Sequence, residues 1–417
     1  MRKLAVAWID RASRLAVILV PLFAMHARAG VEFVIALVDA GFLIRCVLTG
    51  EWAWLRAGWV IAGAFWWLWL MVCSLPAIGI GGTAALVQAV VIVRFLLFVA
   101  ALERTVLASA AARRWLQGAL VATAVYIGGQ SLLQFATGRN LWGYPRSPFG
   151  ELTGPFLLAR AGAPLSRLIF PTMLPALAHL LQAGTAGRLA AVALAVLAVG
   201  TQVLIGQRMP LLLVVFGLAI AALLLRPLRP ALLAGVLGGG LLIAATAALA
   251  PPTFYRLVTK FSAQMEAFPQ SDYGLIAARA VFIAEAHPLF GQGFDGFRNA
   301  CPNPTYWHGW SATPDTPDGG GMRICSIHPH NHYLEAVTNA GLPGLVLFSA
   351  LILLWLRDLG RGLWRHPDPL RVGLFVAALI QEWPIASASG FTGLEIASFF
   401  FLLLGYGLAL ARDAART

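Results

Sequence analysis

The residues most capable of chemistry in this chain lie within residues 328–344, HPHNHYLEAVTNAGLPG. Three histidines alternate at its start, His328, His330 and His332, and the carboxylate of Glu335 follows within one helical turn. Imidazole titrates near neutral pH, so one of these histidines could accept a proton from an attacking hydroxyl group. The apolar residues that follow predict a helix, which places the histidines where a polar loop meets that helix.

The composition indicates that a membrane surrounds this helix. The chain is 59% hydrophobic and 12% charged over 417 residues, whereas soluble domains carry about 25% charged residues. We therefore predict an all-α polytopic membrane protein with about twelve transmembrane helices. The first apolar run is interpreted as a span and not as a removed signal peptide. The predicted spans are roughly 14–28, 31–49, 54–75, 84–106, 115–137, 165–184, 188–206, 209–226, 230–250, 332–357, 370–387 and 392–411.

The arginines orient these spans. Most basic residues between spans fall on one side, which the positive-inside rule assigns to the cytoplasm together with both termini. The net charge of +12 is thus partly topogenic, and no nucleic-acid partner is predicted. Arginines on the outer side need another explanation, and guanidinium groups bind phosphate oxygens in bidentate fashion. The outer basic residues are Arg28, Arg139, Arg146, Arg160, Arg167, Arg208, Arg256, Lys260, Arg279, Arg298 and Arg323.

Two long polar segments divide the chain. Residues 137–164 interrupt the first nine spans, which occupy residues 1–250. Residues 251–331 are too many for a simple connection, so we predict a helical domain there, on the outer side. The last three spans then occupy residues 332–417.

The outer domain has features of its own. Thr253 could cap an amphipathic helix, and a second helix is predicted over residues 273–286. Cys301 and Cys325 both lie in this domain, on the oxidising side of the membrane, which predicts a disulfide.

The histidine segment resembles a known signature. His330 and Asn331 are followed by nine residues, Gly341, two more residues and Gly344. At the start of a transmembrane helix, this pattern resembles that of bacterial lipopolysaccharide O-antigen ligases. A looser form occurs across the superfamily of O-antigen ligases and polymerases. The family's twelve spans, with a large periplasmic loop between the ninth and tenth, are similar to the layout predicted here.

The resemblance extends to two arginines. The family has one just after the seventh span, where Arg208 stands here. It has another on a loop helix upstream of a segment like HPLFGQG at residues 287–293, which corresponds to Arg279. The resemblance also implies an architecture similar to the C-type membrane glycosyltransferases.

The activity that the resemblance implies is glycosyl transfer at the periplasmic face of the bacterial inner membrane. An O-antigen polysaccharide would move from undecaprenyl pyrophosphate, among membrane lipids, to a sugar hydroxyl of lipid A–core. Departure of a pyrophosphate requires nearby positive charge, which Arg208 and Arg279 could supply without a metal or cofactor. His330 could accept the hydroxyl proton, and direct displacement would invert the anomeric centre. The predicted substrate contacts are Arg208, Arg279, Arg94, Arg146, Arg160, Arg323, His328, Asn331, His332 and Glu335.

Other interpretations stay open. Arg94 lies inside the apolar run VVIVRFLLFV, where a charge must face a cavity or a partner. An O-antigen polymerase or a protein O-oligosaccharyltransferase of the same superfamily would differ in its acceptor. A lipid-linked oligosaccharide transporter would explain the spans and Arg94, but not the histidines and arginines gathered on one side. Asp315 and Asp318 could hold a metal with the histidines, although a Pro/Gly-rich hairpin tip suits them better, and we expect no metal.

Overall fold

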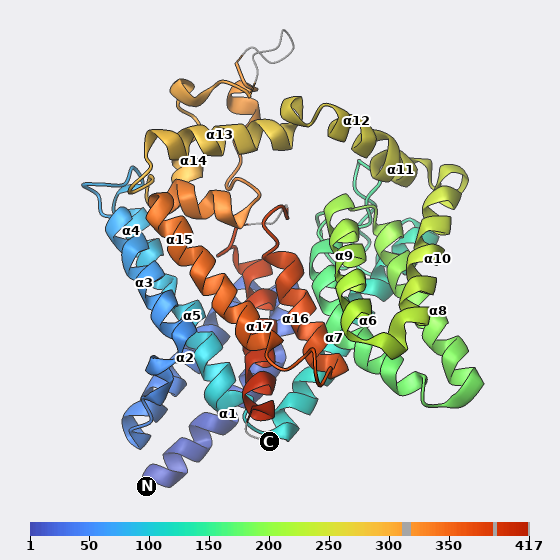
Figure 1. The fold of residues 1–417 in the computed structure, drawn as a ribbon, viewed down its shortest axis with the longest axis horizontal. Helices are drawn as coiled ribbons and strands as arrows, with labels where there is room; N and C mark the ends of the chain where they lie inside the picture. Colours follow the sequence, from blue (N-terminus) through green and yellow to red (C-terminus); the bar gives the residue numbers. More distant parts are fainter. Residues whose placement is uncertain (311–317, 387–389, 416–417) are drawn as a thin grey trace.

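The computed structural model describes residues 1–310, 318–386 and 390–415, and the regular structure in these ranges is helical (Figure 1). An isolated antiparallel bridge between Arg139 and Pro145 is the only β pairing within them. The main bundle consists of α1 (Arg2–His26), α2 (Arg28–Thr49), α3 (Gly58–Cys73), α4 (Gly82–Val91), α5 (Val93–Ala101), a π-helical turn (Leu102–Val106), α6 (Ala110–Thr137), α7 (Gly162–Leu180), α8 (Gly184–Ile205), α9 (Arg208–Leu224), α10 (Arg229–Leu249), α15 (His332–Gly360), α16 (Pro369–Gln381) and α17 (Leu394–Ala414).

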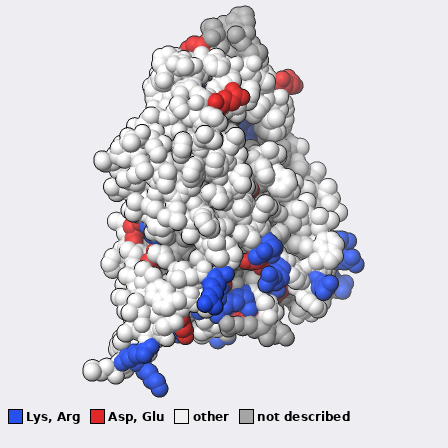
Figure 2. All heavy atoms as spheres, turned by 60° about the vertical axis from the view of Figure 1, so that its left-hand side comes forward, with Lys and Arg blue, Asp and Glu red and all other residues white. Residues whose placement is uncertain are grey.

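Six helical stretches in the described residues are long and apolar enough to cross a membrane, and α3, α9 and α16 are shorter apolar helices. The six are Gly82–Val106, Ala110–Thr137, Gly184–Ile205, Arg226–Leu249, His332–Gly360 and Ala397–Ala414. On the face drawn in Figure 2, the Lys and Arg side chains gather toward one end and leave a broad area almost without charge. The chain is thus a helical membrane protein. Each of the twelve predicted spans contains a helix, and the number that cross the bilayer stays a prediction.

The bundle has two hydrophobic cores that lie side by side. One core packs α1 to α6 against α15 and α17, and the other packs α7 to α10 against α16. The predicted boundary of the eleventh span was too long, because α16 ends at Gln381. Pro384 follows closely and cannot continue a helix. The segment after α16 then turns back toward the start of α15.

The described residues between 251 and 331 form a cap segment across one end of the bundle (Figure 1). Its elements are α11 (Pro251–Phe254), a π-helical turn (Tyr255–Thr259), α12 (Lys260–Glu266), α13 (Asp272–Ala286), α14 (Gly296–Ala300) and short 3₁₀ turns at Phe268–Gln270, Pro304–Tyr306 and Gly321–Ile324. The predicted cap at Thr253 was wrong, since the helix starts at Pro251. A proline fits the first helical turn because the N–H it lacks would have no partner there. The structure joins Cys301 to Cys325 in a disulfide.

The cap segment docks onto a kink in α15. Gly341 has φ +64° and ψ −169°, a conformation that essentially only glycine adopts. A Cβ there would lie 2.3 Å from the carbonyl oxygen of Leu289. The backbone N–H of Leu342 donates to Pro288, and the N–H of Gln292 donates to Thr338, both within 2.8 Å. The 287–293 segment and the glycine half of the histidine motif therefore form one structural unit.

Candidate active site

Asn331 fixes the start of α15. Its Oδ1 accepts hydrogen bonds from the backbone N–H groups of Tyr333 (2.9 Å) and Leu334 (3.0 Å), which is the geometry of a helix N-cap. Its Nδ2 donates to the carbonyl oxygen of Pro384 at 2.7 Å. Both ends of the amide are thus used within the protein. Asn331 thus anchors the start of α15, and its contact with substrate stays a prediction.

His330 lies in the left-handed backbone region, with φ +55°. This conformation costs a non-glycine residue about 1 kcal/mol or more. Its N–H donates to Nδ1 of His328 at 3.2 Å. The ring centroid of His330 lies 4.5 Å from that of His328 and 5.5 Å from that of Tyr273, edge to face in both pairs. The strained backbone therefore brings the His330 ring against α13.

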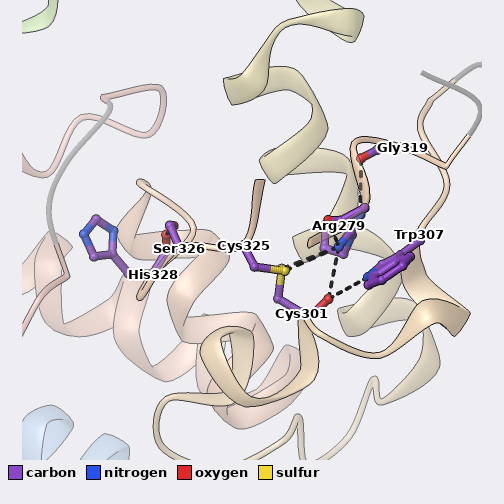
Figure 3. The surroundings of a disulfide bond; sticks show 8 residues. Arg279, Cys301, Trp307, Gly319, Cys325, Ser326 and His328 are labelled. Carbon is purple, nitrogen blue, oxygen red and sulfur yellow. Dashed lines mark hydrogen bonds between the residues drawn. A yellow bond between two sulfur atoms is a disulfide. The ribbon is translucent and has the colours of Figure 1, made fainter. Parts of the chain in front are cut away.

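His328 is neutral at physiological pH. Burial and, to a smaller extent, the neighbouring His330 and His332 lower the pKa of His328 to about 3. Its Nδ1 already accepts the N–H of His330, so a proton at that nitrogen would break the turn. His328 is consequently a poor base, and it acts here as a fixed hydrogen-bond acceptor. The Ser326 hydroxyl donates to the His328 carbonyl and ties this turn to the neighbouring Cys325 (Figure 3).

The third histidine, His332, is held in place by a buried carboxylate. Nδ1 of His332 lies 2.9 Å from Oε2 of Glu382, and both side chains are buried. The Tyr333 hydroxyl donates to the Glu382 carbonyl at 2.7 Å. The buried Arg167 of α7 interacts favourably with the charge of Glu382. A carboxylate on one imidazole nitrogen fixes the tautomer and the ring orientation, so Glu382 locks the position of His332.

A cavity of about 410 Å³ lies beside the motif. It collects side chains from the ends of several helices and from the loops that precede α7 and α9. Three arginines and two carboxylates line it (3 − 2 = +1), which leaves a net positive charge when His328 is neutral. Arg298 is 3.8 Å from Asp295. The charged and amide side chains of the lining are Arg28, Gln88, Arg160, Gln207, Asp295, Arg298, His328 and Glu335.

The cavity lining combines predicted substrate contacts with residues that sequence reasoning did not single out. Arg160, His328 and Glu335 were predicted substrate contacts, and the structure brings them together. Arg28 and Arg298 were predicted only as arginines on the outer side of the membrane. The positive-inside rule does not require basic residues there, and this was the sequence feature that could have identified them as site residues. Glu335 accepts a hydrogen bond from the N–H of Phe391 at 3.0 Å. Its carboxylate therefore faces the cavity in a fixed orientation.

Arg208 lies at the edge of this site. It is the first residue of α9 and follows Gln207, which lines the cavity. Its guanidinium donates to the Gln264 side chain of α12 and lies near Tyr273 of α13. Since Tyr273 also contacts His330, this tyrosine stands between Arg208 and His330. Neither Arg208 nor His330 lines the cavity itself.

Arg279 does not line the cavity, and its contact with the pyrophosphate stays a prediction. Its side chain is fully buried in the cap segment. The guanidinium donates to the carbonyl oxygens of Cys301 (3.0 Å), Gly321 (3.0 Å) and Gly319 (3.2 Å), beside the disulfide and near the Trp307 ring (Figure 3). Burial lowers the pKa of Arg279 to about 10, so the group stays charged at neutral pH. The cap folds around this cation.

Three other predicted arginine contacts lie elsewhere. Arg146 donates to the Phe135 carbonyl, and Arg323 pairs with Asp272 on the surface of the cap. Arg94 pairs with Glu32 in a separate groove. Of the two aspartates considered for a metal, Asp315 lies outside the described residues, and Asp318 accepts the N–H of Gly320 at 3.0 Å. Within the residues that the structure describes, no three His, Cys, Asp or Glu side chains gather as a metal site would require.

Comparison with known proteins supplies one match. The model of a family described as O-antigen ligase matches residues 193–349. This range begins in α8 and includes Arg208, the whole cap segment and the histidine motif with its two glycines. No curated protein matches the chain.

Proposed function

We propose that this chain, whose residues 193–349 match the model of the O-antigen ligase family, transfers a polysaccharide from undecaprenyl pyrophosphate to a sugar hydroxyl of lipid A–core. The reaction takes place at the periplasmic face of the bacterial inner membrane, with both termini in the cytoplasm. The observation that carries this proposal is a cationic cavity beside the histidine motif of a membrane protein.

The arginines of the cavity bind the donor. Arg28, Arg160 and Arg298 converge from separate elements on a volume of about 410 Å³. A pyrophosphate presents several oxygen acceptors, and guanidinium groups bind such oxygens in pairs. These arginines stabilise the negative charge that grows on the departing pyrophosphate, so the reaction needs no metal. Arg208, at the edge of the site, meets the incoming headgroup or the sugar next to it.

His330 accepts the proton. The acceptor oxygen attacks the anomeric carbon of the donor sugar, and the bond from that carbon to the pyrophosphate oxygen breaks. The proton of the hydroxyl moves to the His330 ring, and the electron pair of the broken bond leaves with undecaprenyl pyrophosphate. Attack from the side opposite the leaving group inverts the anomeric centre. Glu335, whose carboxylate lines the cavity, is the alternative base.

The test uses the full chain in nanodiscs, with undecaprenyl-pyrophosphate-linked polymer and purified lipid A–core. Formation of a long-chain lipopolysaccharide ladder supports the proposal. His330→Ala should abolish the ladder, and the exposed His366 provides the matched control variant, His366→Ala. A wild-type protein that extends the lipid-linked polymer and never modifies lipid A–core would identify a polymerase and overturn the proposal.

A further inference from the structure

A second groove opens on the outside of the bundle next to the central cavity. It has a volume of about 530 Å³ and lies between α2, α4 and α5. Its walls carry two apolar side chains, Val87 and Val91, that are 61% and 43% exposed. In a membrane protein such side chains face lipid. The groove is therefore open to the hydrocarbon region of the bilayer.

The same groove contains a pair of charges. Nη2 of Arg94 lies 3.0 Å from Oε1 of Glu32, and Nη1 donates to the Val91 carbonyl at 3.0 Å. Nε of Arg94 is buried without a hydrogen-bond partner. Asp39, a second acidic residue of α2, is buried inside the bundle. Charges in a membrane segment are costly, and those that face a cavity mark the path of a substrate or ion.

The groove and the central cavity meet at one side chain. Gln88 of α4 lines both. On α2, Glu32 lines the groove, and Arg28, four residues earlier on the same helical face, lines the cavity. A polar route thus leads from Arg94 past Gln88 to Arg28.

We propose that this groove is the lateral portal through which undecaprenyl pyrophosphate passes from the bilayer into the central cavity. The inference rests on the proposed function. The pyrophosphate exchanges with Glu32 for the guanidinium of Arg94, because a doubly charged group with paired oxygens outcompetes a single partly exposed carboxylate. The headgroup then moves past Gln88 to Arg28, and the hydrocarbon chain trails along Val87 and Val91.

The size of the groove favours this occupant over the acceptor lipid. Its volume is in the range of sites for single small ligands. A pyrophosphate with the first isoprene units of one polyprenyl chain fits such a space while the rest of the chain stays in the bilayer, whereas lipid A brings several acyl chains together. The two lipid substrates also have to be present at the same time, so the acceptor must approach from a different side.

The first experiment locates the hydrocarbon chain. Cysteine is placed at Val87 or Val91 and labelled with a photoreactive benzophenone, and the full chain is reconstituted with sugar-free undecaprenyl pyrophosphate. Leu237 on α10 is an equally exposed control position. We expect crosslinks to the polyprenyl chain at positions 87 and 91, at least tenfold above position 237. Equal crosslinking at position 237 would overturn the portal. So would loss of the crosslink on addition of equimolar inorganic pyrophosphate, since the groove would then recognise free phosphate and not a lipid.

The second experiment separates the portal from the chemistry. Arg94→Gln should lower crosslinking and transfer from undecaprenyl pyrophosphate about tenfold, while Arg229→Gln on the exposed end of α10 should change neither. Val87→Trp should obstruct the groove without touching the charge pair. Both groove variants should recover full transfer with a short-chain, detergent-soluble donor that reaches the cavity from water. If Arg94→Gln and Val87→Trp transfer normally from the undecaprenyl donor, the portal is refuted. If the wild type transfers from neither donor, the proposed function fails while the crosslinking result still decides the portal.

Discussion

Replacing Arg279 with glutamine tests whether this arginine holds the cap segment together or binds substrate. Its guanidinium donates hydrogen bonds of 3.0, 3.0 and 3.2 Å to three backbone carbonyls inside the cap. A hydrogen bond from a charged donor contributes about 1.5–3 kcal/mol, and these three do not add because they share one group. We expect Arg279→Gln to lower the free energy of unfolding of the cap by about 1.5–3 kcal/mol. The neutral amide has only two N–H donors and cannot replace all three hydrogen bonds, although the Trp307 indole N–H still donates to the Cys301 carbonyl.

Hydrogen–deuterium exchange of the full chain in nanodiscs measures this effect. Arg279→Gln should exchange faster in α13 and in residues 318–325, and the Cys301–Cys325 disulfide should be reduced faster by dithiothreitol. Arg298→Gln is the matched control, because Arg298 lines the cavity. It should weaken the binding of undecaprenyl pyrophosphate and leave exchange in the cap unchanged. If Arg279→Gln instead keeps the cap protected and loses lipid binding, the structural assignment is refuted and Arg279 returns to the phosphate site.

Four further predictions concern the histidine motif and Glu382, the buried partner of His332. His330→Ala should lower transfer by about 10²–10⁴-fold, the usual contribution of a general base, with unchanged donor binding in an equilibrium assay. His330→Gly should lose as much activity as His330→Ala. Its free energy of unfolding, measured by thermal melting, should be about 1 kcal/mol higher than that of His330→Ala, because glycine adopts φ +55° without strain. Glu382→Gln should lower kcat about 10–100-fold with little change in KM, because it misplaces His332; equal kinetic constants would contradict this role. Acidification from pH 7 to pH 5 should cost about 2 kcal/mol of stability at His328. Burial lowers its pKa to about 3, so the stabilisation is complete above the unfolded pKa of about 6.5 and is lost as the pH falls toward 3. The melting temperature of His328→Gln should change less between pH 7 and pH 5 than that of the wild-type protein.

The helices of this protein were largely predictable because their signals are local. Apolar runs gave the membrane helices, and the second cap helix predicted over residues 273–286 is α13, which begins one residue earlier. The errors occur where a proline decides the boundary. Pro251 starts a helix two residues before the predicted cap at Thr253, and α16 stops at Gln381, shortly before Pro384.

The roles of the arginines could not be predicted, because their partners are distant along the chain. Arg279 is satisfied by carbonyls 22 to 42 residues away. A sequence shows that a cation is present in the cap, but not that a turn closes around it. Conversely, Arg28 and Arg298 become candidates only when the fold brings their helices to one cavity. In the sequence, Arg28 and Arg298 were predicted on the outer side of the membrane, as Arg279 was. That placement alone does not distinguish a cavity-lining arginine from one buried in the cap.

The two halves of the histidine motif have different physical tasks, and the fold explains why they occur together. The first half presents His330 at a strained turn that leans on Tyr273 of α13. The second half lets α15 accept the backbone of residues 288–293 at Gly341, where a side chain would collide with Leu289. Both contacts join α15 to the cap segment, at either end of α13. A change in how the cap sits on α15 would therefore move Tyr273 relative to His330 and Arg208. Since the proposed base and the edge of the phosphate site are positioned through the same element, the docking of the cap sets the distance between the proton acceptor and the leaving group.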